Sequence, residues 1–179
     1  GRLTKWKGQV MFIEALSLLV DNHNKNNFHA VILGSNQGRD VYSKKLSLLV
    51  ERYRLGKKIT FIKSCKEMPI AYELSDLVIS SSIEPEAFGR VAVEAQAMNK
   101  PIIASNLGGS METVLKGKSG LLYNSKDPKE LARNINRLME TDKISLRLMG
   151  EQGRKNVERK FNVDQMCQTT FTEYKKLLK

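Results

Sequence analysis

The chain is poor in the residues that hold metal ions or form disulfide frameworks. Its 179 residues include only two cysteines and two histidines. Cys65 and Cys167 lie about a hundred residues apart and form no CxxC pair, so we expect free thiols in a reducing cytoplasm. His23 and His29 are six residues apart, a spacing that does not place both on one face of a helix. We therefore predict no metal site.

Long apolar segments are also missing. No run approaches the roughly 20 apolar residues that cross a bilayer, and no apolar stretch follows the opening GRLTKWKG as a signal peptide requires. The chain starts without methionine, and we expect it to be part of a longer protein. Apolar residues at 41% and charged residues at 27% are typical of a compact domain, and 179 residues suit one domain.

The charge is one-sided, with a net value of +11. Nine Lys or Arg stand against three acids in residues 36–69, and nine against four in residues 143–179. Such surfaces attract nucleic acid, anionic lipid or small anions. Aromatic residues make up only 7% and no recognition motif is present, so we predict no nucleic-acid partner. A solvated lysine-rich face and peripheral contact with the inner face of a membrane both stay open.

Short apolar runs and helical periodicity alternate along the chain. This order is typical of an α/β fold, a Rossmann-like parallel sheet with helices on both faces, here followed by C-terminal helices. Ligands of such sheets bind at the carboxyl ends of the strands, which are expected after Ile62, Ser80 and Ser105. The expected strands are 28–33, 58–62, 77–81, 102–105 and 120–123, and the expected helices are 8–22, 40–54, 67–74, 89–98, 110–116, 128–140, 143–159 and 163–178.

The segment after Ser80 carries the most informative pattern. Gly89 stands at an expected helix start, and Glu86 and Glu94 flank it, separated by seven residues. The free N–H groups and the dipole of a helix start favour a phosphate, and a carboxylate accepts hydrogen bonds from neighbouring sugar hydroxyls. The alternative is structural, because glutamates at the start of a helix also complement its dipole.

Two other segments point to a phosphorylated ligand. Arg2 and Lys7 precede the first expected helix, and two cations ahead of a helix start make a pyrophosphate site. The paired glycines Gly108 and Gly109 follow a strand, where they allow close approach of a ligand. Alone, each pattern is also explained by solvated surface cations or an ordinary turn.

Together these motifs resemble the C-terminal domain of GT-B-fold retaining glycosyltransferases of family 4, the glycosyl transferases group 1. The resemblance covers essentially the whole chain. Its most specific part is the E-x7-E pattern within EPEAFGRVAVEAQAMNKPIIAS. Two other segments also match family motifs and occur in the order that the family has them: GRLTKWKG before this pattern and SNLGGSMETVLKGKSGLLY after it.

The resemblance implies a role for each matching residue. Arg2 and Lys7 would hold the donor diphosphate, Glu86 would lie against the donor sugar as the catalytic carboxylate, and Glu94 would bind the ribose hydroxyls. The turn at the helix start would contact the sugar and phosphate, and the end of the second strand would contact the base. These contact residues are Phe88, Gly89, Arg90 and Val91 at the turn, and Ile62 and Lys63 at the strand end.

The resemblance also implies the reaction. A sugar would pass from a nucleoside diphosphate donor, with UDP or GDP as the nucleotide, to an acceptor hydroxyl with retention of configuration. No metal or other cofactor would take part. The reaction would serve cell-envelope polysaccharide or lipid glycosylation in the cytoplasm. The acceptor site would belong to an N-terminal domain that residues 1–179 lack, so we expect this chain to be inactive alone.

The last expected helix, 163–178, would cross back onto that missing domain, and we expect its apolar stripe to self-associate without it. The sequence departs from the family pattern at Lys63 or Ser64 and at Asn99, where the family often has glycine, and at Gln96, where a small or apolar residue is frequent. These departures affect base contacts and helix termination but leave the phosphate and carboxylate ligands in place. A non-catalytic nucleotide-sugar binder or a nucleotide-sugar epimerase on the same fold stays open.

Overall fold

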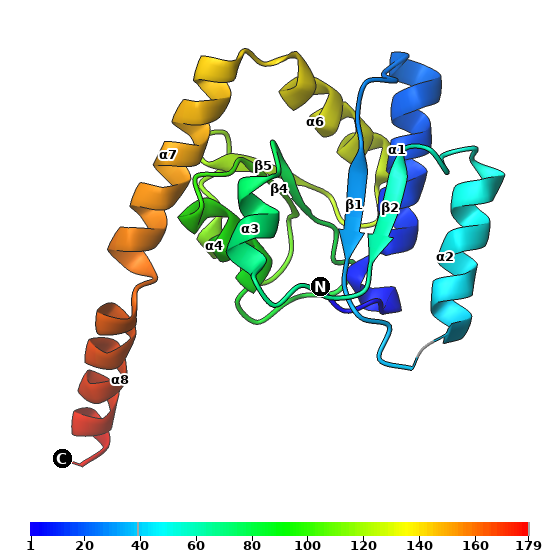
Figure 1. Ribbon diagram of the computed structural model, residues 1–179. Coiled ribbons are helices and arrows are strands. Elements are labelled where there is room, and N and C mark those ends of the chain that lie inside the picture. Colours follow the sequence, from blue (N-terminus) through cyan, green and yellow to red (C-terminus); the bar gives the residue numbers. More distant parts are fainter. Residues whose placement is uncertain (39, 179) are drawn as a thin grey trace.

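The computed structural model describes residues 1–38 and 40–178 (Figure 1). Strands and helices alternate as far as β5, and three helices follow. In chain order the elements are η1 (Lys5–Lys7), α1 (Gln9–His23), β1 (Ala30–Leu33), α2 (Asp40–Arg52), β2 (Ile59–Ile62), α3 (Met68–Glu73), β3 (Val78–Ser80), α4 (Arg90–Ala97), β4 (Ile102–Ser105), α5 (Ser110–Thr113), β5 (Gly120–Tyr123), α6 (Pro128–Glu140), α7 (Lys143–Lys160) and α8 (Val163–Leu177).

All strand pairs are parallel, as predicted, and they form two hydrogen-bonded groups. β1 pairs with β2, and β4 lies between β3 and β5. The N-terminal segment bridges the two groups at their carboxyl ends. Leu3 N–H donates to Ser35 O at 3.0 Å beyond β1, and Ile83 N–H beyond β3 donates to Trp6 O at 2.8 Å. The opening residues therefore lie where both groups of strands end.

Helices cover both faces of the β3–β4–β5 group, which confirms the predicted layers. Successive side chains of a strand point to opposite faces, and on β4 Ile103 joins the larger apolar cluster whereas Ile102 and Ala104 join the smaller one. The larger cluster includes buried residues of α1, α2 and α6. The smaller includes residues of α3 and α4. A strand buried on both faces explains why β4 reads as a continuous apolar run.

Two short elements differ from the sequence-based expectation. Residues 5–7, expected in a loop, form the 3-10 helix η1, which ends at Gly8 with φ of 69°. The helix expected over 110–116 ends at Thr113, because Val114 is extended and Lys116 bridges to Gly120. Three-residue helical turns carry no apolar periodicity, so the pattern does not detect them.

The C-terminal helix α8 extends away from the rest of the molecule (Figure 1). Asn162 caps it by accepting a hydrogen bond from Gln165 N–H at 2.7 Å. It contains no buried residue, although it carries a series of apolar side chains. The exposed ones are Val163, Met166, Phe171, Tyr174 and Leu177. None of the helices in residues 1–38 and 40–178 is long and apolar enough to cross a membrane.

Candidate functional site

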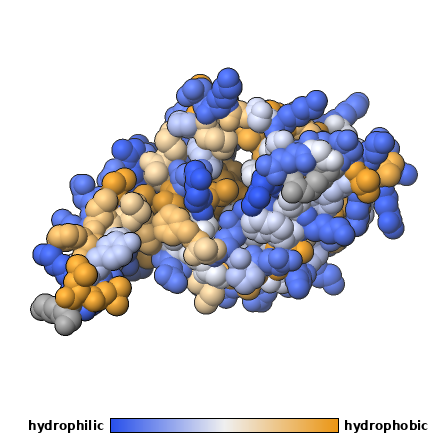
Figure 2. Space-filling model, turned by 90° about the horizontal axis from the view of Figure 1, so that it is seen from below, coloured by the Kyte–Doolittle hydropathy of each residue, from blue (hydrophilic) through white to orange (hydrophobic). Residues whose placement is uncertain are grey.

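The predicted site residues gather at the carboxyl ends of the strands. β1 and β2 point downward in Figure 1, and Figure 2 views the molecule from that side. This face is hollowed near its centre, where apolar atoms show at the bottom and polar groups surround them (Figure 2). Three segments meet at the carboxyl ends of the strands: η1, the loop between β3 and α4, and the loop before α5.

An ion pair between Lys7 and Glu86 joins the first two segments. The Lys7 Nζ lies 2.7 Å from Glu86 Oε1, and the two side chains are only 15% and 13% exposed. The Ser82 hydroxyl donates to the same carboxylate. The ammonium also lies 4.5 Å from the centre of the Trp6 ring. A cation and a carboxylate that are 79 residues apart in the sequence are thus held together and largely shielded from water.

Glycines allow the three segments to approach closely. A Cβ on Gly8 would lie 1.9 Å from Ser81 O, and one on Gly109 would lie 2.5 Å from the carbonyl of Phe88. Gly109 N–H also donates to Glu86 O at 2.8 Å. The paired glycines noticed in the sequence therefore pack directly against the backbone of the Glu86 loop, because only a residue without a side chain fits there.

The start of α4 has the form expected of a phosphate site. Gly89 is its N-cap residue with φ of 74°, and it supplies no capping side chain to the first turn. Arg90 and Val91 are the first helical residues after it. Their backbone N–H groups belong to the set that an α-helix leaves without partners inside the helix. The neighbouring Phe88 packs edge-to-face against Phe161, with ring centres 5.6 Å apart.

Glu94 lies one turn further along α4, and both of its carboxylate oxygens have partners. Oε1 accepts from the Arg90 guanidinium at 2.9 Å and 3.2 Å, and Oε2 accepts from the Tyr72 hydroxyl at 2.8 Å. Burial raises the pKa of Tyr72 well above its usual value, and the hydrogen bond to Glu94 raises it further. The phenol therefore stays protonated and acts as a donor.

Glu86 and Glu94 stand on either side of the turn at Gly89. Glu86 lies in the loop before the turn, where it pairs with Lys7, and Glu94 lies one turn into α4. The segment around the start of α5 packs against this turn, since Gly109 N–H donates to Glu86 O at 2.8 Å and a Cβ on Gly89 would lie 3.3 Å from Ser110 Oγ.

The remaining predicted residues lie at the same edge with looser connections. The Arg2 guanidinium carbon lies 5.7 Å from the centre of the Trp6 ring, on which Lys7 also rests. Ile62 and Lys63 stand at the end of β2, where Ile62 O accepts from Gly34 N–H at 2.8 Å. They belong to the β1–β2 group, whereas Glu86 and Glu94 follow β3 of the other group, so the predicted base contacts and the two carboxylates come from different groups of strands.

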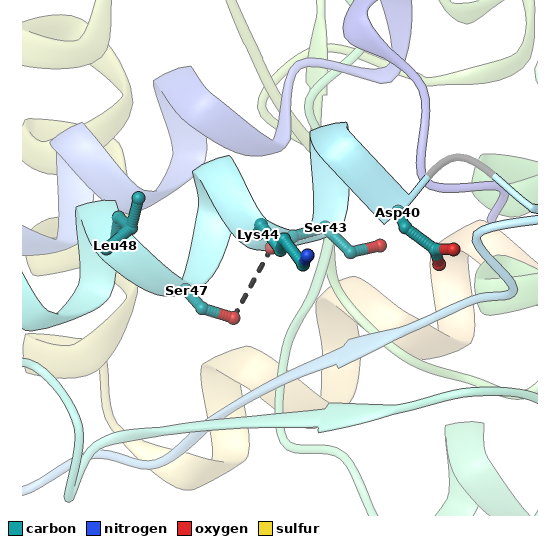
Figure 3. A pocket seen from close by; sticks show the side chains of 5 residues that line it. All are labelled: Asp40, Ser43, Lys44, Ser47 and Leu48. Carbon is teal, nitrogen blue, oxygen red and sulfur yellow. Dashed lines mark hydrogen bonds between the residues drawn. The ribbon is translucent and has the colours of Figure 1, made fainter.

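A second surface hollow lies along α2 (Figure 3). A single helix supplies all its lining residues, and within that helix Ser47 Oγ donates to the backbone Ser43 O at 3.3 Å. This hollow contains none of the predicted site residues. We therefore place the candidate site at the carboxyl ends of the strands. The residues that line the hollow are Asp40, Ser43, Lys44, Ser47 and Leu48.

Sequence reasoning missed two polar residues of the site, Tyr72 and Ser82. Ser82 directly follows the expected strand, so its place at the carboxyl edge was a usable signal. Tyr72 lies on α3 and reaches Glu94 only through the packing of two helices, which no local pattern reveals. Within the described residues, no group of three or more His, Cys, Asp or Glu could hold a metal ion.

Comparison with known proteins gives consistent matches. The family model described as "Glycosyl transferases group 1" matches residues 1–156. A D-inositol 3-phosphate glycosyltransferase of Corynebacterium jeikeium is 33% identical over 84% of this chain and 36% of its own length. The chain spans less than half the length of this curated relative.

Two solved structures share the fold over nearly the whole chain. A glycosyltransferase of Rickettsia africae superposes with a TM-score of 0.90 at 31% identity, covering 100% of this chain and 46% of that one. Anabaena HepE in complex with UDP-glucose gives a TM-score of 0.89 at 30% identity, covering 98% of this chain and 47% of that one.

Proposed function

Because the chain belongs to the glycosyl transferases group 1 family, we propose that it is the donor-binding half of a retaining glycosyltransferase. The observation that carries this proposal is the shielded ion pair of Lys7 and Glu86, in the loop that leads to the start of α4, the helix that carries Glu94. The sugar would pass from a nucleoside diphosphate to an acceptor hydroxyl, and the acceptor would bind a further domain. The sugar acceptors proposed are cell-envelope polysaccharides or lipids.

Lys7, Arg2 and the start of α4 would bind the donor diphosphate. Both cations lie beside Trp6, and Gly89 supplies no capping side chain to the N-terminus of α4. Backbone N–H groups and a helix dipole favour a phosphate, and adjacent cations add to this attraction. When the bond to the sugar breaks, the diphosphate gains negative charge, which the same groups would stabilise.

Glu86 would orient the donor sugar. Its carboxylate is already engaged by Lys7 and by the Ser82 hydroxyl, so it has a defined position from which to accept hydrogen bonds from sugar hydroxyls. This role differs from that of a nucleophile, which needs a matched acid on the other side of the scissile bond. Glu94 would accept from the ribose, and UDP is the first nucleotide to test because HepE was crystallised with it.

Calorimetric titration with UDP, GDP and ADP tests the donor site. We expect one nucleotide, UDP, to bind selectively, and Glu94→Ala to weaken it about 10- to 100-fold because hydrogen bonds to a charged group are lost. Glu112→Ala is the matched control, since Glu112 is an exposed glutamate on the neighbouring α5. A folded wild-type chain that binds none of the three nucleotides would contradict the proposal.

The exposed face of α8 would pack against the acceptor domain in the longer protein. In the isolated chain we expect this apolar stripe to drive self-association at high concentration. Phe171 is 60% exposed on α8, and Phe171→Glu should shift sedimentation toward the monomer. Thr170→Glu adds the same charge one residue away, at an exposed position without an apolar side chain, and should change little. A wild-type chain that sediments as a monomer at all concentrations would refute the expectation.

A further inference from the structure

The contacts of Tyr72 give it a defined place beside the donor site. Its ring is only 6% exposed and packs in the smaller apolar cluster with Ala92 and Ala95 of α4 and with Ile102 of β4. Its hydroxyl emerges at Glu94 Oε2, at 2.8 Å. A buried ring cannot change its position without disturbing the core, so the hydroxyl is a rigid donor.

The backbone of Tyr72 is held as firmly as the ring. Its carbonyl accepts from Ser75 Oγ at 2.7 Å and from Ser75 N–H at 3.0 Å. Lys100, just beyond α4, donates to the carbonyl of the next residue, Glu73, at 2.8 Å. The Ser75 bonds fix the end of α3, and the Lys100 bond joins it to the segment directly after α4, so packed elements on both sides determine the distance between the hydroxyl and the carboxylate.

The other partner of Glu94 is a weaker constraint. The Arg90 side chain is 83% exposed, and its contact with Glu94 is an i,i+4 pair on a helix surface. Exposed pairs of this kind contribute little, since water screens them and the long side chain loses conformational freedom. Of the two partners, Tyr72 is therefore the one that can hold the carboxylate in a single orientation.

We propose that Tyr72 is the positioning residue for Glu94, orienting its carboxylate to accept hydrogen bonds from both ribose hydroxyls of the donor nucleotide. This inference rests on the proposed donor site. An ionised carboxylate offers about four acceptor positions. Tyr72 occupies one position and Arg90 two, so both ribose hydroxyls are accepted when the exposed Arg90 side chain moves away from Oε1, while the buried Tyr72 stays in place. Two neighbouring ribose hydroxyls can both donate to this carboxylate only when the plane of the carboxylate is kept in one orientation.

Tyr72→Phe tests this role, because it keeps the ring and removes only the hydroxyl. We expect affinity for UDP to fall about tenfold, the loss that corresponds to one hydrogen bond to a charged group. Affinity for 2′,3′-dideoxy-UDP, which has no ribose hydroxyls, should change less than about twofold because that ligand makes no use of the orientation. Thermal unfolding of the variant verifies that it is folded.

Two further variants separate the possible explanations. In a Glu94→Gln background, Tyr72→Phe should cause no additional loss of UDP affinity, because the oriented carboxylate is already gone. Tyr174→Phe removes a hydroxyl from an exposed tyrosine on α8 and should bind UDP as wild type does. If Tyr72→Phe lowers the affinity for UDP and for dideoxy-UDP equally, or lowers neither, the positioning role of Tyr72 is overturned. The donor site itself still stands in that case, provided that the wild-type chain binds UDP. A folded wild-type chain without nucleotide affinity would instead refute the donor site itself.

Discussion

Replacing Lys7 with methionine is expected to abolish most donor binding and to destabilise the fold. The ammonium is only 15% exposed and lies 2.7 Å from Glu86. Its loss leaves a shielded carboxylate without its cation, which should lower the free energy of unfolding by about 2 kcal/mol, somewhat less than for a fully buried pair. The diphosphate would lose a charge-assisted contact, and we expect UDP affinity to fall about 30- to 100-fold.

A second substitution separates these two effects. In Lys7→Met/Glu86→Gln the unpaired charge is removed, while the glutamine can still accept from Ser82, so most of the lost stability should return. Donor binding should stay lost, since neither Lys7 nor Glu86 is restored. Lys5→Met is the matched control, because Lys5 is an exposed lysine of the same short helix. Urea unfolding and calorimetry measure both quantities, and wild-type UDP affinity in Lys7→Met would exclude Lys7 from the diphosphate site.

Gly150→Ala is expected to destabilise the protein even though alanine favours helices. In the interior of a helix this exchange ordinarily stabilises by about 1 kcal/mol. Here a Cβ would lie 1.8 Å from the carbonyl oxygen of Asn99, where α7 packs on the end of α4. Asn99 has φ of 56° and a constrained backbone that cannot easily retreat. Overpacking should outweigh propensity, and we expect a net loss of about 2 kcal/mol in the free energy of unfolding.

Gly56→Ala is the control for this effect. A Cβ there would meet nothing within 4 Å, so the unfolding free energy should change by less than about 0.5 kcal/mol. Gly153→Ala should lie in between, because its Cβ would lie 2.9 Å from Gln96 Cγ, a less severe overlap than the 1.8 Å at Gly150. Urea unfolding of the three variants gives the comparison. A Gly150→Ala variant as stable as wild type would show that α7 packs on α4 less closely than the structure has it.

The same contact between α4 and α7 explains two departures from the family pattern. Asn99 takes a positive φ directly after α4, a conformation that asparagine adopts more easily than other residues with a side chain. Gln96 is fully buried, and its amide donates to the carbonyls of Ala92 and Thr113 at 3.0 Å each. Both departures therefore have a local structural role beside α7, away from the ligand-binding side chains.

Much of the fold could be predicted because its signals are local. The strands at 102–105 and 120–123 and the helix at 128–140 have the bounds expected from the sequence. Pro128 at the first position of α6 and Asp127, which accepts from Glu130 N–H at 2.9 Å, are start signals that the sequence displays. Elements without such signals, above all η1 and the end of α5, were predicted wrongly.

Residue types at short spacing were enough to predict the alternation of strands and helices, the helix start at Gly89 with Glu86 and Glu94 on either side of it, and the position of Arg2 and Lys7 ahead of the first long helix. The three-dimensional fold was needed to show that Lys7 pairs with Glu86, that Tyr72 reaches Glu94, and that the strands form two groups joined by the N-terminal segment. These features join residues that are between 22 and 79 positions apart. Their contacts arise from packing between elements, which local spacing does not encode.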